Sequence, residues 1–246
     1  MKKRVLITGG TGMVGSAFQN SDKYEFIKVG TKEFDLTNFT NALNLLMKHR
    51  PDYVIHLAAK VGGVKGNTEY VADFFTQNIL INTNILEACR WYKVPKVVSL
   101  LSTCIYPDSS SYPLTETQIH AGEPHESNFG YAYAKRMLHI QSKAYRRQYG
   151  CNFICAVPNN LFGKHDNFDL ENGHVIPAVI RKIYDAKNIG SESVTFWGDG
   201  TPLREFTYNE DIANALMFLL ENYDGETPVN IGNTSEISIR DLVEHV

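Results

Sequence analysis

The sequence of 246 residues has few cysteines and no long hydrophobic run. Its four cysteines form no Cys-x-x-Cys pair, and its histidines lack ligand spacing with cysteine or acidic residues, so we predict neither a disulfide framework nor a metal site. The basic start is followed by only three apolar residues, 5–7, which is too short for a signal peptide. No stretch reaches the length of a membrane span. We therefore expect a cytoplasmic protein with no membrane partner.

An excess of positive charge is also lacking. The formal net charge is −3 and the isoelectric point is about 6.2, which argues against a nucleic-acid partner. Hydrophobic residues make up 43% and charged residues 21%, values typical of a globular protein. The length fits one large domain with a small second lobe.

A glycine-rich turn follows the first predicted strand, residues 4–8, and leads into a helix with apolar periodicity. This order of strand, turn and helix is typical of dinucleotide binding. Glycines allow backbone N–H groups to approach a pyrophosphate and let the helix pack closely on the strand. The spacing is G-x-x-G-x-x-G. The residues of the turn are Gly9, Gly10, Thr11, Gly12, Met13, Val14 and Gly15.

The residues after the second predicted strand, 24–29, indicate which cofactor is bound. NAD sites usually place an acid there, whereas a cation suits the 2′-phosphate of NADP. Lys32 follows this strand, and Glu33 comes later than the usual acid, so we favour NADP(H). Asp35 and Leu36 are expected at the edge of the adenine pocket.

Strands and helices alternate through the first half of the chain. After Thr37 as an N-cap, the pattern predicts a helix over 39–49, a strand over 53–59, a glycine-rich loop over 60–67, a helix over 70–92 and a strand over 96–101. This alternation predicts an α/β fold with a doubly wound parallel sheet of the Rossmann type, which binds its ligand at the carboxyl ends of the strands. Leu57, Ala58 and Ala59 are expected beside the cofactor. The pattern leaves open whether Asn78 faces solvent or contacts the cofactor.

A tyrosine and a lysine lie four residues apart in a helix predicted over 131–149. Tyr131 and Lys135 therefore share one helix face, and an ammonium there would lower the phenol pKa from about 10. Ser102, at the end of the preceding strand, supplies a second donor to a substrate carbonyl. Each residue alone has an ordinary explanation, as a surface lysine or a strand-end cap. Together with the glycine turn they predict a reductase, in which Ser102 orients a ketone and Tyr131 exchanges its proton.

Five further motifs are spread over the rest of the chain: STCIYP at 102–107, NFGYAYAK at 128–135, GKHDNF at 163–168, HVIPA at 174–178 and WGDGTPLREF at 197–206. Together they resemble the GDP-L-fucose synthases of the extended short-chain dehydrogenase/reductase superfamily, and the resemblance covers residues 5–246. It implies an enzyme that epimerises C3 and C5 of GDP-4-keto-6-deoxy-D-mannose and then reduces C4 with NADPH.

The resemblance also assigns an acid and a base for epimerisation. It implies that Cys104 and His174 serve opposite faces of the sugar, while Ser102 and Tyr131 hold the enolate oxygen. A thiol ordinarily titrates near 8.5 and an imidazole near 6.5, so modest shifts would suffice. On the residues alone, the pattern favours Cys104 as a small buried apolar residue and His174 as a surface residue at a helix start.

The second half of the chain is expected to be a substrate lobe. We predict a nucleotide-binding domain over 1–162 and a lobe over 163–246, partly interleaved with it. Six residues are expected near the cofactor: Tyr131, Lys135, Pro158, Asn160, Leu161 and His174. The resemblance places three near the nucleotide sugar: Lys182, Trp197 and Arg204. The pattern alone leaves Lys182 as equally a solvated helix residue.

Several features depart from the family or leave a different function open. Family members continue for several tens of residues beyond the position matching Val246, so we expect an incomplete lobe, and Thr11 stands where some members have arginine. A 4,6-dehydratase would need an acid where Thr103 and Cys104 stand. A 4-epimerase and a non-catalytic NADP-binding protein also stay open. The two long helices carry apolar residues on more than one face, which favours a homodimer.

Overall fold

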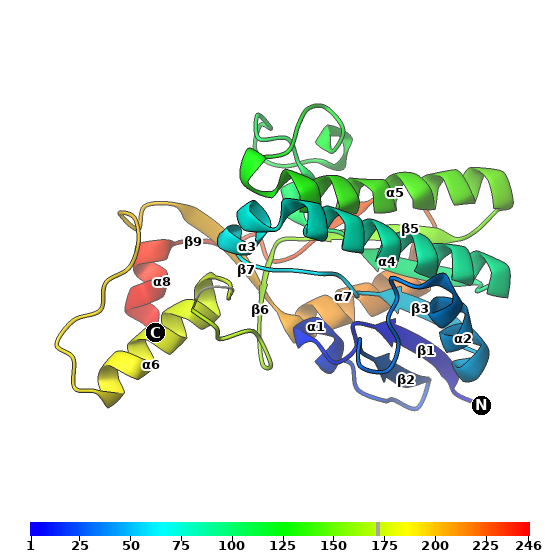
Figure 1. The fold of residues 1–246 in the computed structure, drawn as a ribbon, viewed down its shortest axis with the longest axis horizontal. Coiled ribbons are helices and arrows are strands. Elements are labelled where there is room, and N and C mark those ends of the chain that lie inside the picture. Colours follow the sequence, from blue (N-terminus) through cyan, green and yellow to red (C-terminus); the bar gives the residue numbers. More distant parts are fainter. Residues whose placement is uncertain (171–172) are drawn as a thin grey trace.

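The computed structural model, which describes residues 1–170 and 173–246, is built around a six-stranded sheet (Figure 1). Its strand order is β2-β1-β3-β4-β5-β8, and every neighbouring pair is parallel. The strands are β1 (Lys3–Thr8), β2 (Tyr24–Val29), β3 (Tyr53–His56), β4 (Lys96–Leu100), β5 (Phe153–Pro158) and β8 (Val229–Ile231). All carboxyl ends therefore lie at one edge, which confirms the predicted α/β fold.

Helices cover both faces of this sheet. One core lies beneath α2 (Phe39–His49), α4 (Val71–Tyr92) and α5 (Phe129–Tyr149), and the other beneath α1 (Met13–Ser16) and α7 (Asn209–Asn222). Neighbouring strand residues point to opposite faces, so Leu6 belongs to the first core and Val5 to the second. The uninterrupted apolar runs seen in the sequence reflect this burial on both sides. None of the helices in the described ranges is long and apolar enough to cross a membrane.

A smaller sheet lies beside the carboxyl edge of the large one (Figure 1). It contains β6 (Asn160–Phe162), β7 (Leu203–Tyr208) and β9 (Glu236–Ser238) in the order β6-β7-β9. Helices α6 (Val175–Asn188) and α8 (Ile239–His245) lie in the same part of the molecule. The chain crosses between the two parts repeatedly, because α7 and β8 return to the large sheet after β7.

Most predicted elements match the structure within two residues, and two predictions are wrong. The N-cap of α2 is Asn38, whose side chain accepts a hydrogen bond from the Asn41 N–H at 3.2 Å. Thr37 instead donates its hydroxyl to Asp35 at 2.7 Å. The expected loop after β3 contains helix α3 (Val64–Glu69), where the Asn67 amide caps carbonyls of the preceding turn. In both places a short polar side chain selected the local structure.

Candidate active site

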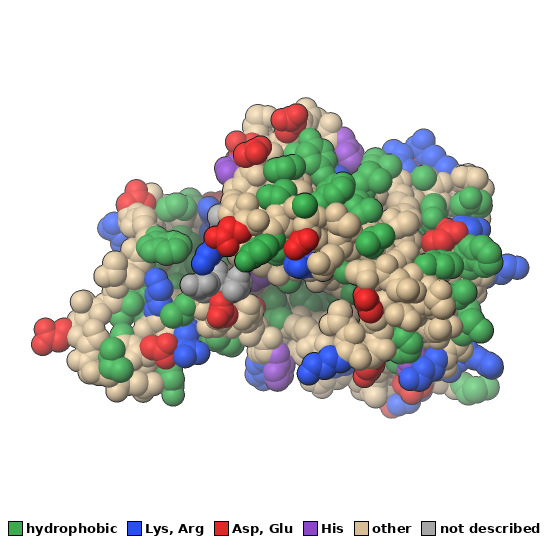
Figure 2. Space-filling model, in the orientation of Figure 1, with side chains coloured by type: hydrophobic (Ala, Val, Ile, Leu, Met, Phe, Trp, Pro, Cys, Tyr) green, Lys and Arg blue, Asp and Glu red, His purple; other side chains and the backbone are tan. Residues whose placement is uncertain are grey.

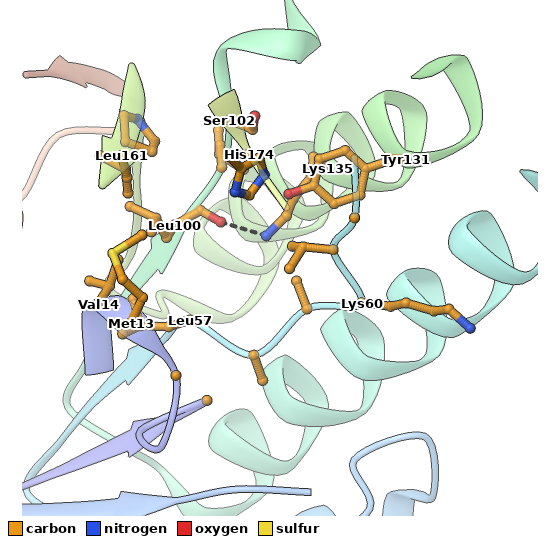
Figure 3. A pocket seen from close by; sticks show the side chains of 18 of the residues that line it. Met13, Val14, Leu57, Lys60, Leu100, Ser102, Tyr131, Lys135, Leu161 and His174 are labelled. Atoms are coloured by element: carbon orange, nitrogen blue, oxygen red, sulfur yellow. Dashed lines mark hydrogen bonds between the residues drawn. The ribbon is translucent and has the colours of Figure 1, made fainter. Parts of the chain in front are cut away.

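A cavity of about 910 Å³ opens at the carboxyl edge of the large sheet and extends to the small one. Its walls come from the glycine turn, the residues that follow β2, β3, β4 and β5, and the starts of α5 and α6. Figure 3 shows some of the side chains that line it. Open parallel sheets bind their ligands in this position, so the cavity is where the predicted chemistry should be sought.

The glycine turn forms the floor of the nucleotide end. Gly9 has a left-handed φ of 67°, and a Cβ there would lie only 2.9 Å from the Ala58 nitrogen. A Cβ at Gly15 would lie 2.5 Å from the Gly10 Cα, so no side chain fits at either position. Thr11 lines the cavity at the tip of the turn. These two glycines therefore let the turn pack tightly against the backbone after β3 and against itself, a compact path that suits a bound pyrophosphate.

The side expected to hold the adenosine contains Asp35 and Leu36. The Asp35 carboxylate accepts hydrogen bonds from the backbone N–H and the hydroxyl of Thr37 at 2.9 and 2.7 Å, and these bonds lower its pKa. Lys32 is exposed beside this wall, but it is not among the described residues that line the cavity. Other residues predicted to contact the cofactor do line it: Gly12, Met13, Val14, Leu57, Ala58, Ala59, Pro158, Asn160 and Leu161.

All five residues predicted to be catalytic line this cavity. Ser102 follows β4, and its Oγ is 2.8 Å from the Cys104 Sγ in the next turn. Tyr131 and Lys135 come from the first turns of α5, and His174 is the N-cap of α6. Figure 3 shows side chains from these separate elements turned toward the same space. The structure thus brings together residues that are far apart in the chain.

The predicted electrostatic role of Lys135 is wrong for this geometry. Burial raises the pKa of the Tyr131 phenol, the nearby Cys104 raises it further, and a hydrogen bond from Ser102 opposes both. Lys135 is 2% exposed and donates to the Leu100 carbonyl at 2.8 Å, and burial lowers its own pKa to about 8. The Lys135 ammonium, 5.8 Å from the centre of the Tyr131 ring, is not among the causes of this shift, and the loss of water around the phenol sets its direction. Tyr131 therefore stays protonated at neutral pH, as a proton donor to a reduced ketone must.

The pKa of the Cys104 thiol is shifted in the same direction and for the same main reason. Burial raises its pKa, while the Ser102 hydroxyl and the Lys135 ammonium oppose the rise. The expected modest shift into the neutral range is therefore replaced by a shift in the upward direction. The resting group is a thiol that can give a proton, rather than a thiolate that takes one.

Asn78 fixes the position of the loop after β3 from inside the protein. It is fully buried, its Oδ1 accepts from the Lys60 N–H at 3.0 Å, and its Nδ2 donates to the carbonyls of Lys60 and Phe74 at 2.9 and 2.7 Å. It therefore faces neither solvent nor the cavity, which contradicts both readings of the sequence. Its amide fixes the path of the loop after β3, and Lys60 in that loop lines the cavity.

A buried chain of hydrogen bonds, which sequence reasoning missed, links β1 to α5. The His56 ring lies 2.7 Å from the Thr8 hydroxyl through Nδ1 and 3.0 Å from the Asn82 Oδ1 through Nε2, and the Asn82 amide donates to the Ala134 carbonyl at 3.3 Å. The Asn82 oxygen can only accept, so His56 carries its proton on Nε2. Burial first, and Lys135 second, lower the pKa of His56 to about 3, so the ring is neutral. The sequence did contain a signal for this network, because His56 is a histidine within an otherwise apolar strand.

The residues predicted to bind the nucleotide sugar divide into two groups. Arg204, on β7, lines the cavity. Lys182 and Trp197 are not among its described lining residues: the Lys182 ammonium lies 5.6 Å from the centre of the Trp197 ring, which is 93% exposed. Three further asparagines line the cavity, Asn67, Asn128 and Asn159, and Asn159 accepts a hydrogen bond from the Thr207 hydroxyl at 2.7 Å.

The fold and the site together define an extended short-chain dehydrogenase/reductase. They combine a parallel sheet, a glycine-rich turn after its first strand, and a serine, a tyrosine and a lysine at the carboxyl edge. The model of the NAD dependent epimerase/dehydratase family matches residues 5–232. A GDP-L-fucose synthase of Dictyostelium discoideum is 43% identical over 98% of this chain and 78% of its own length. One from Sinorhizobium fredii is 41% identical over 99% of this chain and 79% of its own.

A solved structure shows the same relationship. The GDP-L-fucose synthetase of Naegleria fowleri, crystallised with NADP, superposes with a TM-score of 0.91 at 38% identity, covering 98% of this chain and 81% of that one. The chain therefore belongs to the NAD dependent epimerase/dehydratase family, in the branch of the GDP-L-fucose synthases.

Proposed function

We propose that the protein epimerises C3 and C5 of GDP-4-keto-6-deoxy-D-mannose and reduces C4 with NADPH, which yields GDP-L-fucose. The observation that carries this proposal is one cavity that contains both a reductase set and an additional acid–base pair. Ser102, Tyr131 and Lys135 serve the reduction, while Cys104 and His174 add the pair that epimerisation needs. The names of the relatives support the same substrate.

The geometry supports both halves of the reaction. Protons on carbons beside a ketone are acidic, because the charge left behind moves to the oxygen as an enolate. In this proposal Ser102 and Tyr131 donate hydrogen bonds to that oxygen, and Cys104 and His174 give and take the carbon protons; all four line the same cavity. NADPH, when bound, supplies the hydride for the second half. Tyr131 then gives its phenolic proton to the C4 oxygen, and Lys135 holds the ribose next to it.

The test is incubation with GDP-4-keto-6-deoxy-D-mannose and NADPH in deuterated water. We expect loss of NADPH absorbance and deuterium at C3 and C5 of the product. GDP-mannose serves as the control substrate, because a 4,6-dehydratase would convert it without net oxidation of the cofactor. An absence of NADPH oxidation with the keto sugar would overturn the proposal, and NADPH binding without any turnover would favour a binding protein.

We propose that Lys32 supplies the cation for the 2′-phosphate of NADP(H). It is exposed next to Thr31 at the nucleotide end of the cavity, from which its long side chain can reach the phosphate. Lys32→Ala should weaken NADPH binding about tenfold, as expected for one exposed charge-assisted contact, and leave NADH binding unchanged. Fluorescence titration with both cofactors measures this, with Lys2→Ala as a control of equal charge. Equal weakening for both cofactors would count against the assignment.

We also propose a homodimer formed through α4 and α5. Hydrophobic side chains gather over these helices on the face shown in Figure 2. Eight large hydrophobic residues of the two helices are more than a third exposed: Phe75, Leu80, Trp91, Phe129, Tyr133, Met137, Ile140 and Tyr149. Exposed apolar patches of this kind mark interaction surfaces. Sedimentation equilibrium reports the assembly, and a monomer at all concentrations would contradict it.

The proposed division of the chain remains residues 1–162 for the nucleotide and 163–246 for the sugar. Helix α6 and strands β7 and β9 support it, since they lie outside the large sheet, whereas β6 falls before the boundary and α7 and β8 return to the large sheet. A cytoplasmic location is proposed as well, because all four cysteines are free and thiols persist in a reducing compartment.

A further inference from the structure

Asp166 is a buried acid beside His174 that the reaction outlined above does not use. It lies between β6 and α6, and its side chain is only 6% exposed. Its Oδ1 accepts a hydrogen bond from the Asn167 N–H at 2.7 Å and lies 4.0 Å from the His174 Nδ1. Its Oδ2 is buried with no hydrogen-bond partner among the described residues. A buried carboxylate with one unpaired oxygen lowers the stability of the fold. Its presence therefore calls for an explanation, and a functional role is one.

The backbone around Asp166 is shaped to bring it to the histidine. His165 adopts a left-handed φ of 65°, which is uncommon for a residue other than glycine. Gly173 closes the loop by donating to the Asp169 carbonyl at 2.8 Å, and a Cβ at Gly173 would lie 2.5 Å from the Asn167 oxygen. A side chain at position 173 would therefore force the loop apart. These constraints hold an acid and a histidine side by side although eight positions separate them.

Asp166 is the acidic residue that lies within ion-pair distance of His174 among the described residues. The charged side chains among the described residues lining the cavity, His174 aside, are Asp35, Lys60, Lys135 and Arg204. Asp35 is therefore the acidic side chain among them, and it follows β2, whereas His174 begins α6. Asp166 also borders a second pocket, which it lines together with Phe162, Lys164, Phe168, Ile176, Pro177 and Tyr208.

We propose that Asp166 is a positioning residue that orients His174 and stabilises its protonated form during epimerisation. The carboxylate accepts the Nδ1–H, which fixes the tautomer and presents Nε2 to the sugar. When Nε2 takes a proton from a carbon beside the ketone, the C–H electron pair moves to the enolate oxygen and the imidazolium is held by Asp166. Cys104 then gives its proton to the opposite face of that carbon as the electron pair returns from the enolate, and exchange with solvent moves the proton from the imidazolium back to the thiolate. A small turn of the half-exposed His174 ring closes the 4.0 Å gap, as catalytic contacts often tighten when substrate binds.

Asp166→Asn tests this inference, which rests on the proposed function. Asparagine keeps the acceptor for the Asn167 N–H and removes only the charge. Deuterium exchange at C3 and C5 should fall about 10- to 100-fold. The melting temperature should hold or rise, because a buried and partly unpartnered charge is removed. Asp185→Asn, on an exposed turn of α6 where Asp185 pairs with Arg181, is the control and should exchange at the wild-type rate.

Two further measurements separate positioning from a structural role. In a His174→Gln background, Asp166→Asn should change the residual exchange by less than about twofold, since both residues act through one group. In ¹⁵N-histidine spectra of the unaltered protein, neutral His174 should carry its proton on Nδ1. A proton on Nε2, or exchange in Asp166→Asn at the wild-type rate, would overturn the inference. So would a parallel loss of exchange and thermal stability.

Measurements on the wild-type protein distinguish a failure of the proposed function from a failure of the inference about Asp166. If the wild-type protein neither exchanges protons at C3 and C5 nor oxidises NADPH with the keto sugar, the proposed function fails, and the inference fails with it. If the wild type is active and Asp166→Asn is equally active, only the inference fails.

Discussion

Replacing Tyr131 by phenylalanine should lower kcat for NADPH oxidation by about 10²- to 10⁴-fold, the usual contribution of a positioned general acid. The ring and its packing at the start of α5 remain, and only the hydroxyl is lost. Because burial keeps this phenol protonated at neutral pH, it is a ready donor to the C4 oxygen. Without it the developing alkoxide has only Ser102 to stabilise it. Steady-state loss of NADPH absorbance with the keto sugar measures the effect.

Tyr133→Phe is the matched control for this change. Tyr133 lies two residues further along the same helix, is 36% exposed and packs its ring against the Arg136 guanidinium, outside the described lining of the cavity. Its substitution should leave kcat within about twofold, as is usual for surface positions. The affinity for NADPH should be unchanged in both variants. A Tyr131→Phe enzyme that oxidises NADPH at the wild-type rate would refute the reductase mechanism.

The Cys104→Ala variant should stop epimerisation while a slow, direct reduction of C4 persists. The thiol is protonated, lies 2.8 Å from the Ser102 hydroxyl and faces the cavity, so it is placed to deliver a proton to a carbon. Loss of this acid should reduce deuterium incorporation by about 10²-fold or more. Tyr131, Lys135 and Ser102 remain, so the unepimerised ketone should still be reduced. Mass spectrometry of the product measures deuterium and hydride transfer in one sample.

Cys151→Ala provides the control for thiol removal. Cys151 is a half-buried cysteine just before β5 and is not among the described residues of the cavity. The Cys151→Ala variant should incorporate deuterium at C3 and C5 of the sugar at the wild-type rate. Unchanged exchange in Cys104→Ala would refute the assigned acid, whereas a loss of both exchange and reduction would indicate that the thiol supports the whole site.

The sequence was informative wherever the cause of a structure is local. Strand β2 and helix α2 have the predicted bounds, and the glycine turn sits where its spacing placed it, because apolar runs and glycines act through their neighbours. The position of Asn38 as a cap depended on which of two adjacent polar side chains the turn would select. Periodicity contains no information on that choice.

The less predictable features of the site depend on burial and on contacts between distant segments. The raised pKa of Tyr131 follows from the loss of water around it, which the Tyr-x-x-x-Lys spacing does not encode. The amide of Asn78 is turned inward by the loop at Lys60, eighteen positions away. His56 and Asp166 are recognisable only once their partners are placed. Motifs identified the reacting groups, and tertiary packing determined their protonation.

The repeated crossing of the chain between its two sheets limits how this enzyme could be recombined with its relatives. Strand β8 completes the large sheet beside β5, pairing Val229 with Ala156, and α7 covers the core on the α1 side. A single splice near residue 163 would leave that edge bare and strip an apolar face, so neither fragment should fold alone. Exchange of sugar specificity by grafting would need two separate inserts, one from β6 to β7 and one after β8, with the intervening helix and strand left in place.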